Sequence, residues 1–382
     1  MKKTCRYKLL SILVSLVLFF FFLLFGEFVI RLFDLKPYQG HGLLNQQKIN
    51  PSGNAELKKI LTESSTFKME HKYPQFQNEE VDYSKKFEPN ILVQENQNEL
   101  KPNVKSTSIA RTKTSGAIIY KVNVTTDSFG RRYTPVSAAS DSNILFFGDS
   151  FTFGEGVNDN ETFPYHVSIR RPKSAVYNLG VPGLGLNDLL FDLEFGNAKK
   201  YADIPKRKSI SVYTYMNDHL VRFFCSVECY RERGQWLLKK ARFDRKLYYQ
   251  GTFSEANSTE AYVYKLLAKS QLLAYLNINW PMIFTNEHFD TFARAVRKVK
   301  NLTREKFGSE KFYFVFYPRN TSLIYAKKLI PYLKKYNIDY LVYEDIDYDG
   351  IVNDVESIPL DRHPTPIAHY LTAYLLDRDL PK

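Results

Sequence analysis

The sequence predicts an α/β fold, in which a five-stranded parallel sheet lies between helical layers in a flavodoxin-like, three-layer sandwich. Two observations support this prediction. From about residue 141 onward, short apolar runs alternate with longer helical patterns, which is typical of βαβ units. One of these runs, Ile144–Phe147, stops at Gly148-Asp149-Ser150, as a buried strand that enters a turn would. Right-handed crossovers between such strands give the parallel sheet.

The predicted elements follow from this alternation. The strands are expected at Asn143–Phe147, Ala175–Asn178, Ser209–Tyr215, Lys311–Tyr317 and Asp339–Val342. The helices are expected at Thr162–Arg170, Asn187–Lys199, Glu287–Phe307, Ser322–Lys335 and Pro364–Leu376. The stretch at about 220–281 breaks the alternation and is too long for an unstructured loop, so we interpret it as an insertion in a domain of residues 141–382. The insertion is expected to contain a hairpin around Ala241–Phe253 and a helix near Thr259–Tyr275.

The segment before this domain divides into two parts. Four basic residues precede the apolar run Leu9–Phe25, which is longer than a signal-peptide core and has no small-residue cleavage site after it. We therefore expect residues 1–35 to be a cytoplasmic N-terminus and a single transmembrane helix, with a cleaved signal sequence as the alternative. Because the positive charges lie before the span, the rest of the chain should lie outside the cytoplasm. Residues 36–140 are expected to be a polar tether and a lead-in segment, with a strand at Ala117–Val124.

Composition narrows the classes of partner. The chain has 382 residues, 44% of them hydrophobic, and a formal net charge of +12. A basic surplus suits anionic lipids, anionic glycans or nucleic acid, but the chain has no nucleic-acid-binding motif and carries the expected membrane segment. Nucleic acid is therefore not expected as a partner. Cys225 and Cys229 are four residues apart, which allows either a local disulfide in an oxidising compartment or two buried thiols.

Ser150 is the candidate nucleophile. The turn after Ile144–Phe147 places it at the carboxyl edge of the sheet, where open α/β sheets bind their ligands. Acyl transfer by a serine hydroxyl also needs a base, a group that orients the base, and donors for the oxyanion. The alternative is a helix N-cap, since Ser is a favoured cap residue. The nucleophile elbow of α/β-hydrolases is excluded, because that motif requires Gly where Thr152 stands.

Two later stretches also follow predicted strands and combine glycine or asparagine with a turn. Asn178–Gly185 contains Gly183, and the order of its glycines differs from that of a dinucleotide-binding loop, so a Gly-Pro turn is the plain alternative. Asn217 follows the third strand, where the pair Asn217-Asp218 also suits an Asx turn.

The candidate base is His363, because Asp361 lies two positions before it and can fix its tautomer. Pro364 is expected to open the last helix, so that His363 lies in a loop at the sheet edge. His369 then lies inside the helix and is expected to pack or to form a local hydrogen bond. The alternatives are Asp361 as a helix N-cap, Asp354 as the orienting carboxylate, and a metal site formed by Asp361, His363 and His369.

Four stretches of this chain resemble, in type and order, the four sequence blocks of the SGNH (GDSL-like) hydrolases: Gly148–Ser150, Asn178–Gly185, Tyr215–Asp218 and Pro359–Pro364. The run from Gly148 to Val157 is similar to the bacterial, membrane-anchored branch of that family. The resemblance covers about residues 141–376, apart from the insertion. It implies the same fold, with Ser150 as nucleophile, His363 as base and Asp361 as the group that orients the base. It also implies an oxyanion hole formed by the backbone N–H groups of Ser150 and Gly183 and the side-chain amide of Asn217, with no metal or cofactor.

Two departures from the family pattern stand beside these matches. The commonest family spacing of the last block is Asp-x-x-His, whereas this chain has Asp361-x-His363. The residue two positions before Asn217 is Tyr215, where the family more often has Gly.

The resulting functional expectation is a membrane-anchored serine esterase at the inner (cytoplasmic) membrane of a bacterium, with a single membrane pass and its catalytic domain facing the periplasm or the outside. Its expected substrate is an ester, with O-acetyl groups of envelope glycans as the candidate class by analogy with relatives. Two alternatives remain open at this stage. The same acyl-enzyme can serve an O-acetyltransferase, and the chain can be a catalytically silent envelope anchor or binding module.

Overall fold

The computed structural model describes residues 2–33, 79–82, 87–88, 99–136, 140–196, 198–231, 237–276, 278–280, 284–318, 325–343 and 357–382. The chain forms two compact units. The larger unit comprises Lys48–Phe223, Phe243–Tyr249 and Asn286–Lys382. The smaller unit comprises Met1–Gln47, Phe224–Arg242 and Gln250–Thr285. Each unit is described by itself below.

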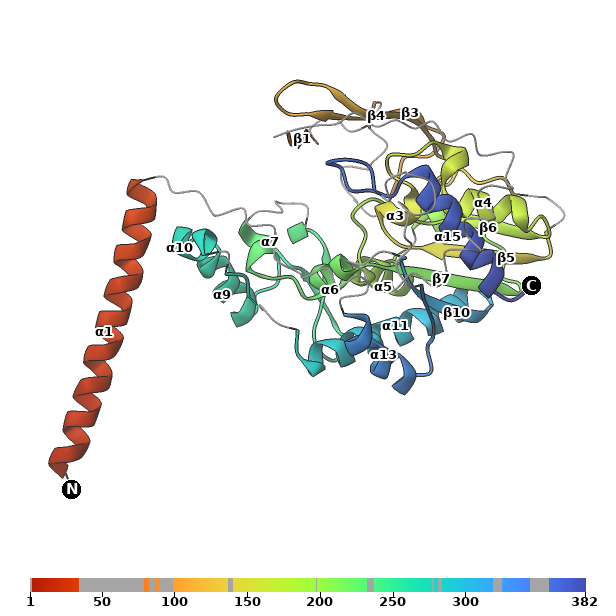
Figure 1. Ribbon diagram of the computed structural model, residues 1–382. Helices are drawn as coiled ribbons and strands as arrows, with labels where there is room; N and C mark the ends of the chain where they lie inside the picture. Colours follow the sequence, from red (N-terminus) through yellow and green to blue (C-terminus); the bar gives the residue numbers. More distant parts are fainter. Residues whose placement is uncertain are drawn as a thin grey trace. The chain divides into compact units, whose positions relative to one another are not determined.

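The larger unit is built on a five-stranded parallel sheet, as predicted (Figure 1). The spatial order of its strands is β11-β10-β7-β5-β6. β5, which comes first along the chain among these five strands, therefore lies inside the sheet and not at its edge, as in flavodoxin-like folds. The strands lie at β5 (Ser142–Phe147), β6 (Ser174–Asn178), β7 (Ser209–Tyr215), β10 (Ser309–Phe316) and β11 (Asp339–Val342). All five predicted strands are present, with ends that differ from the prediction by two residues at most.

One face of the sheet is covered by α4 (Phe163–Arg170) and α15 (Pro366–Asp379), which pack against each other. Successive side chains of a strand point to opposite faces, so Ile144 and Phe146 of β5 share one face. Both are buried in the same apolar cluster as Phe163 of α4, and the rings of Phe146 and Phe163 lie 5.3 Å apart.

The other face is covered by α11 (Asn286–Phe307), which packs against α5 (Leu186–Glu194) and α13 (Ala326–Lys335). Phe147 of β5 points to this side, and its ring lies 6.3 Å from that of Phe307. The sheet therefore lies between two helical layers, and the three-layer prediction is confirmed. The predicted helix Ser322–Lys335 is described only from Ala326, since residues 319–324 lie outside the described part of the chain.

Short elements complete the described chain. In the larger unit they are α3 (Ser150–Phe153), η1 (Asp159–Glu161) and η2 (Lys199–Tyr201), and α6 (Asn217–Phe224) ends at the boundary between the units. The predicted hairpin is present as β8 (Ala241–Phe243) and β9 (Tyr249–Thr252).

The lead-in segment forms a second, antiparallel sheet in the larger unit. Its longest strands are β3 (Lys105–Thr112) and β4 (Ile118–Thr125), and β4 is the strand predicted at Ala117–Val124. The short strands β1 (Val81–Asp82) and β2 (Phe87–Glu88) also pair with β3. The tether predicted before these strands, residues 36–78, lies outside the described residues.

Arg132 fixes the end of this lead-in segment to the loop after α3, in the larger unit. Its side chain is fully buried. The guanidinium donates to the carbonyl oxygens of Gly154 and Val157 at 3.1 and 2.9 Å, and to Asp159 Oδ1 at 2.7 Å. A buried cation is stable only when its donors are satisfied in this way. The loop that follows Ser150 is therefore held by a residue from outside the predicted catalytic domain.

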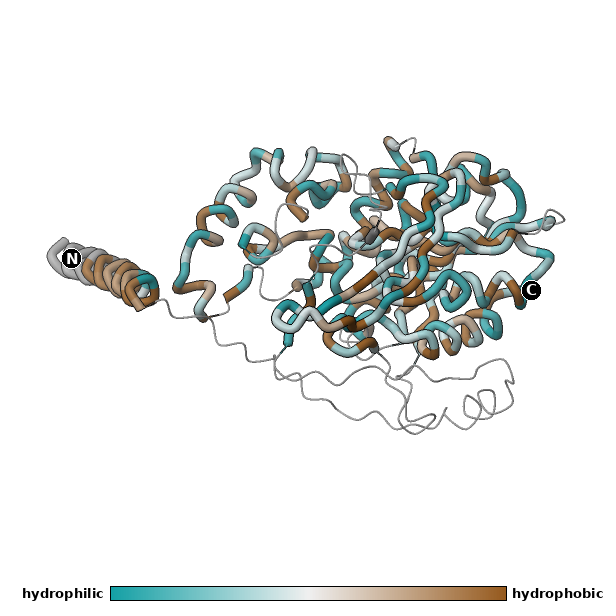
Figure 2. Tube along the Cα trace, turned by 90° about the horizontal axis from the view of Figure 1, so that it is seen from above, coloured by the Kyte–Doolittle hydropathy of each residue, from teal (hydrophilic) through white to brown (hydrophobic). Residues whose placement is uncertain are grey.

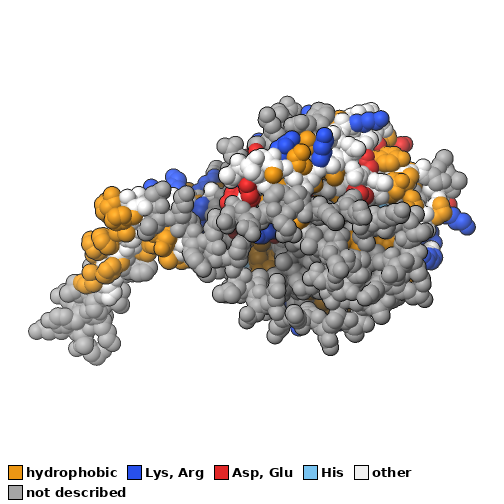
Figure 3. Space-filling model, turned by 45° about the horizontal axis from the view of Figure 1, so that its top comes forward, with side chains coloured by type: hydrophobic (Ala, Val, Ile, Leu, Met, Phe, Trp, Pro, Cys, Tyr) orange, Lys and Arg blue, Asp and Glu red, His pale blue; other side chains and the backbone are white. Residues whose placement is uncertain are grey.

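The smaller unit contains α1 (Lys2–Leu32), where the transmembrane helix was predicted. Most of the described side chains of its second half are apolar and exposed, among them Phe21, Phe22 and Leu24. Hydrophobic residues follow this helix in Figures 2 and 3. Within the described part of the chain, no helix is both long and apolar enough to cross a membrane.

The helix predicted at Thr259–Tyr275 is divided into α9 (Thr259–Leu267) and α10 (Gln271–Tyr275). The break occurs because Ser270 caps α10 by accepting a hydrogen bond from the N–H of Leu273. Glu27 of α1 adds a second cap, since its carboxylate accepts from Ser270 Oγ and from the N–H groups of Gln271 and Leu272 at 2.8–2.9 Å. Glu27 is also paired with Arg31, 2.8 Å away, as their i,i+4 spacing predicts.

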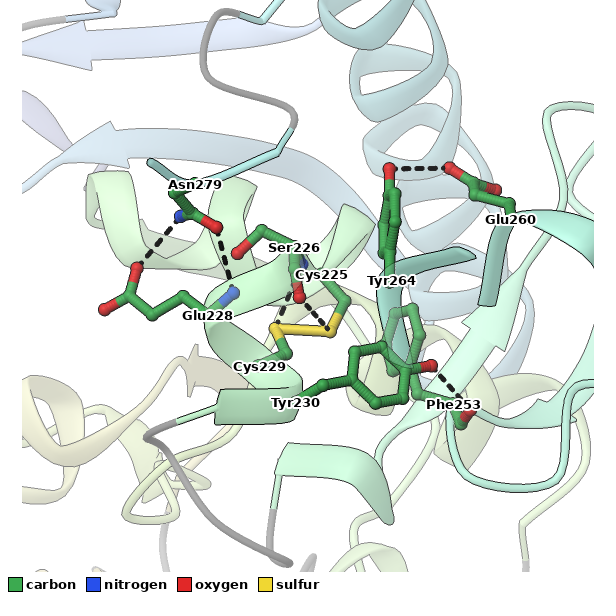
Figure 4. The surroundings of a disulfide bond; sticks show 9 residues. All are labelled: Cys225, Ser226, Glu228, Cys229, Tyr230, Phe253, Glu260, Tyr264 and Asn279. Atoms are coloured by element: carbon green, nitrogen blue, oxygen red, sulfur yellow. Dashed lines mark hydrogen bonds between the residues drawn. A yellow bond between two sulfur atoms is a disulfide. The ribbon is translucent and has the colours of Figure 1, made fainter. Parts of the chain in front are cut away.

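Cys225 and Cys229 form a disulfide in the smaller unit (Figure 4). Their Cα atoms lie 5.8 Å apart, and both residues are 1% exposed. Cys229 belongs to α7 (Val227–Arg231), and its Sγ accepts from the N–H of Ser226. Of the two states that the sequence left open, the structure contains the bridged one.

Candidate active site

Ser150 lies immediately after β5, at the carboxyl end of the parallel strands, and begins α3. The N-cap of α3 is Asp149, whose Oδ1 accepts from the N–H of Phe151 at 3.1 Å. The alternative role of Ser150 as a helix cap is therefore taken by its neighbour. Ser150 itself is 6% exposed.

Two glycines allow the main chain to fold closely around this turn. A Cβ atom on Gly148 would lie 2.1 Å from Thr152 Oγ1, and one on Gly180 would lie 2.4 Å from the backbone nitrogen of Phe153. Neither position has room for a side chain. Gly180 belongs to the glycine-rich stretch that follows β6, so this stretch packs directly on the turn that carries Ser150.

Gly183 lies in the same stretch and has a φ of 78°, a value that favours glycine. The turn around it is closed by a hydrogen bond from the N–H of Leu184 to the carbonyl oxygen of Val181, at 3.0 Å. The N–H of Val181 donates to the carbonyl oxygen of Gly148 at 3.2 Å. The backbone thus ties the Gly183 turn to the Ser150 turn.

Asn217 follows β7 and begins α6. Its Oδ1 accepts from the hydroxyl of Tyr215 at 3.2 Å. Its Nδ2 is buried and has no hydrogen-bond partner among the described residues. A buried amide donor without a partner costs about 1–3 kcal/mol, and a bound acceptor would recover this. Tyr215, which departs from the family pattern, therefore orients the amide so that its N–H groups remain available.

His363 and Asp361 lie together in the loop that precedes α15. Asp361 Oδ1 is hydrogen-bonded to His363 Nδ1, and the Asp361 side chain is fully buried. Leu360 and Arg362, on either side of Asp361, have φ values of 62° and 65°, so the loop turns sharply at both positions. The N–H of Ile358 donates to the carbonyl oxygen of His363 at 2.8 Å and closes the turn.

The sequence left three alternatives for the residues around His363: a helix cap, a different orienting carboxylate and a metal site. Thr365 is the N-cap of α15, where its side chain accepts from the N–H of Ala368, so Asp361 is not the cap. The helix begins at Pro366 rather than at Pro364. Asp354 lies outside the described residues. Among the described residues, no group of His, Cys, Asp or Glu side chains has the arrangement of a metal site.

His369 is buried inside α15, as expected from its place beyond the helix start. It is 0% exposed, and its Nδ1 accepts from the N–H of Phe163 at 3.3 Å. Its ring stacks on that of Phe163, 5.8 Å away. Burial, helped by the neighbouring charges of His166 and Arg132, holds the pKa of His369 well below its usual range.

Sequence reasoning missed a polar network beneath Ser150. Asp149 Oδ2 lies 2.9 Å from Arg222 Nη1 and 3.2 Å from His219 Nε2, and His219 Nδ1 lies 2.7 Å from the hydroxyl of Tyr213. Burial opposes ionisation of Asp149, but His219 and Arg222 prevail and hold its pKa well below the usual range. The available signal was the i,i+3 spacing of His219 and Arg222, which places two polar side chains on one face of α6, a helix that begins at the sheet edge.

Ser150 Oγ makes no hydrogen bond to His363 within the described chain. His363 Nε2 instead lies 3.4 Å from Glu155 Oε2. The imidazole also lies beside Phe151, with the two rings 5.6 Å apart. Hydrogen bonds between catalytic groups are often long without substrate and tighten when it binds.

The fold and the site define a class: a flavodoxin-like α/β protein with a serine, an asparagine amide and a histidine–aspartate pair at the carboxyl ends of its strands. Comparison with protein-family models and with curated proteins finds no match. Three solved structures resemble this chain at low sequence identity. They are a member of the lipolytic G-D-S-L family from Veillonella parvula (13% identity, 63% of this chain and 98% of that chain, TM-score 0.35), a family two carbohydrate esterase from Clostridium thermocellum in complex with cellohexaose (12%, 65% and 65%, 0.37), and an acetyl xylan esterase from Butyrivibrio proteoclasticus (11%, 65% and 65%, 0.37).

These similarities are too low to carry a functional argument.

Proposed function

We propose that the chain is a serine esterase that works through an acyl-enzyme. The observation that carries the proposal is the His363–Asp361 pair, whose carboxylate is buried. The pair lies beside the turn of Ser150, since His363 contacts both Phe151 and Glu155. The amide donor of Asn217, which has no partner among the described residues, lies at the same edge of the sheet. Each group comes from a different loop at the carboxyl edge of one sheet. A nucleophile, an oriented base and an oxyanion donor are the parts that acyl transfer requires.

The reaction follows from these parts. As the Ser150 oxygen attacks the ester carbonyl, its proton passes to His363 Nε2, and Asp361 holds the ring through Nδ1. The negative charge on the carbonyl oxygen is stabilised by the N–H groups of Ser150 and Gly183 and by Asn217 Nδ2. The proton then leaves on the departing alcohol, and a water molecule, activated by the same imidazole, hydrolyses the acyl-enzyme to the free acid.

The membrane attachment is a second part of the proposal. The basic residues before the apolar run and the exposed apolar side chains of α1 support an N-terminal anchor at the inner membrane, with the sheet-bearing unit outside the cytoplasm. The disulfide between Cys225 and Cys229 supports an oxidising compartment. The basic surplus supports an acidic polymer, such as an acylated envelope glycan, as the natural ester.

The test uses the full chain purified in detergent, with p-nitrophenyl acetate and O-acetylated glycans as substrates. Acetate release should be lost in Ser150→Ala and retained in Ser168→Ala, which replaces another buried serine that only bonds within its own helix. Release that survives in Ser150→Ala would overturn the esterase proposal. Transfer of acetyl groups to added sugar in excess of release would assign the same acyl-enzyme to a transferase.

A further inference from the structure

Glu155 is a buried carboxylate that the esterase mechanism does not use. It is 4% exposed and follows α3, and its N–H donates to the carbonyl oxygen of Ser150 at 3.0 Å. The flanking glycines, Gly154 and Gly156, have φ values of 86° and 84°. Two residues in the left-handed region on either side of Glu155 turn the chain sharply, so the direction of its side chain is fixed by the backbone.

The loop that carries Glu155 is held from both sides. Arg132 binds the carbonyl oxygens of Gly154 and Val157, as described above. On the other side the loop abuts the segment before His363, because a Cβ on Gly156 would lie 2.4 Å from Ile358 Cδ1. Glu155 is thus placed against the imidazole by rigid, buried backbone and not by a flexible surface loop.

The contact between Glu155 and His363 places a second carboxylate at the imidazole, so that each ring nitrogen has a carboxylate beside it. Glu155 Oε2 lies 3.4 Å from Nε2, while Asp361 is hydrogen-bonded to Nδ1. An imidazole with a carboxylate at each nitrogen is favoured as the imidazolium, in which both nitrogens are donors. The base must lose its Nε2 proton before it can accept one from Ser150.

We propose that Glu155 is a positioning residue that holds the resting His363 ring through Nε2 and favours its protonated form, so that esterase activity begins only at a higher pH. This inference rests on the proposed function, since it assigns a regulator to the same base. Other charged groups act on the pair from the surrounding elements. The charges of Arg132 and Glu155 interact, and His369 of α15 lies within electrostatic reach of His363.

The first test is the pH dependence of ester hydrolysis in Glu155→Gln. The amide keeps the size of the side chain and removes its charge. The midpoint of the acidic limb should fall by about one pH unit, the scale expected for a neighbouring charge, while the rate on the alkaline plateau stays within a few-fold of the wild-type rate. Glu155→Asp withdraws the carboxylate from the ring and should give a smaller shift. Glu161→Gln is the matched control, since this nearby carboxylate bonds Asn158 instead, and it should leave the midpoint unchanged.

The second test does not depend on catalysis. In the Ser150→Ala chain, the imidazole of His363 is titrated by ¹⁵N NMR and assigned by comparison with His363→Ala. Its midpoint should fall by about one pH unit when Glu155→Gln is added. An unchanged midpoint in folded protein would overturn the proposal, as would a plateau rate in Glu155→Gln that falls more than a hundredfold, because Glu155 would then take part in the chemistry. A shifted midpoint, together with an absence of esterase activity in the wild-type chain, would support the Glu155–His363 coupling and reject the proposed function alone.

Discussion

The loop before α15 and the helix itself each contain a histidine, and the two side chains have opposite environments. His363 retains 15% of its side-chain exposure and has a carboxylate at each ring nitrogen. His369, six positions later, is fully buried among aromatic rings and accepts a backbone N–H. The same residue type thus lies between two carboxylates in one place and is kept neutral by burial in the other. The difference lies in whether the residue stands before or after the first helical turn, because that decides whether it faces the sheet edge or the core.

The largest expected effect is a loss of esterase activity when His363 is replaced, but not when His369 is replaced. His363→Ala should lower kcat for p-nitrophenyl acetate by about 10³–10⁴-fold with little change in Tm, because the base is lost from a partly exposed loop. His369→Ala should retain most of the activity of its folded fraction. Loss of activity in His369→Ala with retention in His363→Ala would reverse the comparison and reject the Asp361–His363 assignment.

A smaller kinetic effect is expected at Asn217, which lies at the same edge as His363 but acts on charge rather than on a proton. Asn217→Ala should lower kcat by about 10²–10³-fold, or about 2.7–4 kcal/mol of transition-state stabilisation, with a small change in KM. Tyr215→Phe, which removes the hydroxyl that orients the amide, should cost less. Equal KM and kcat changes in Asn217→Ala would indicate a role in substrate binding instead.

The free energy of unfolding should depend on pH through the buried histidines, His369 and His166. The pKa of His369 lies well below its ordinary value, and burial together with Arg170 lowers that of His166 to about 4. Below about pH 6.5 the unfolded chain therefore binds protons that the folded chain does not, so the free energy of unfolding should fall as the pH falls from about 6.5 towards 4. Denaturant titrations across this range measure the slope, which should be shallower in His369→Ala. That variant should also be less stable at pH 8, by about 1–3 kcal/mol.

The smallest effect is expected away from both histidines, in the smaller unit. Replacing Cys225 and Cys229 by Ser should lower stability by about 2 kcal/mol or less, because the closed loop is short and little chain entropy is at stake. Esterase activity should be unchanged. A large loss of activity in the double variant would contradict this expectation, because all the proposed catalytic residues belong to the larger unit.

Much of the sheet could be predicted because its strands are short, apolar and separated by helical periods. Ser150, Asp361 and His363 could be placed at its edge for the same reason, since the ends of parallel strands meet there. The short contact between Asp361 and His363 follows from their separation of two positions and from a turn with two left-handed residues.

The partners of Asp149 and Glu155 could not be predicted. His219 and Arg222 reach Asp149 from a helix that follows a different strand, and this distance is set by the pairing of β5 with β7. The contact between Glu155 and His363 depends on backbone angles at two glycines and on Arg132, which stands before the predicted domain. The break between α9 and α10 was missed because one of its caps, Glu27, is supplied from the other end of the chain.

The cap that Glu27 places on α10 has a practical consequence for producing the protein. A chain shortened to start at about Lys36 would lose the apolar helix, and with it the carboxylate that satisfies three donors of a short helix far away in the sequence. Because short helices depend on their caps, the region from Thr259 to Leu276 of such a fragment should fray and become the first place that a protease cuts. Removing the apolar helix α1 would therefore also remove the acceptor that caps α10, and a shortened chain needs a substitute acceptor for these donors.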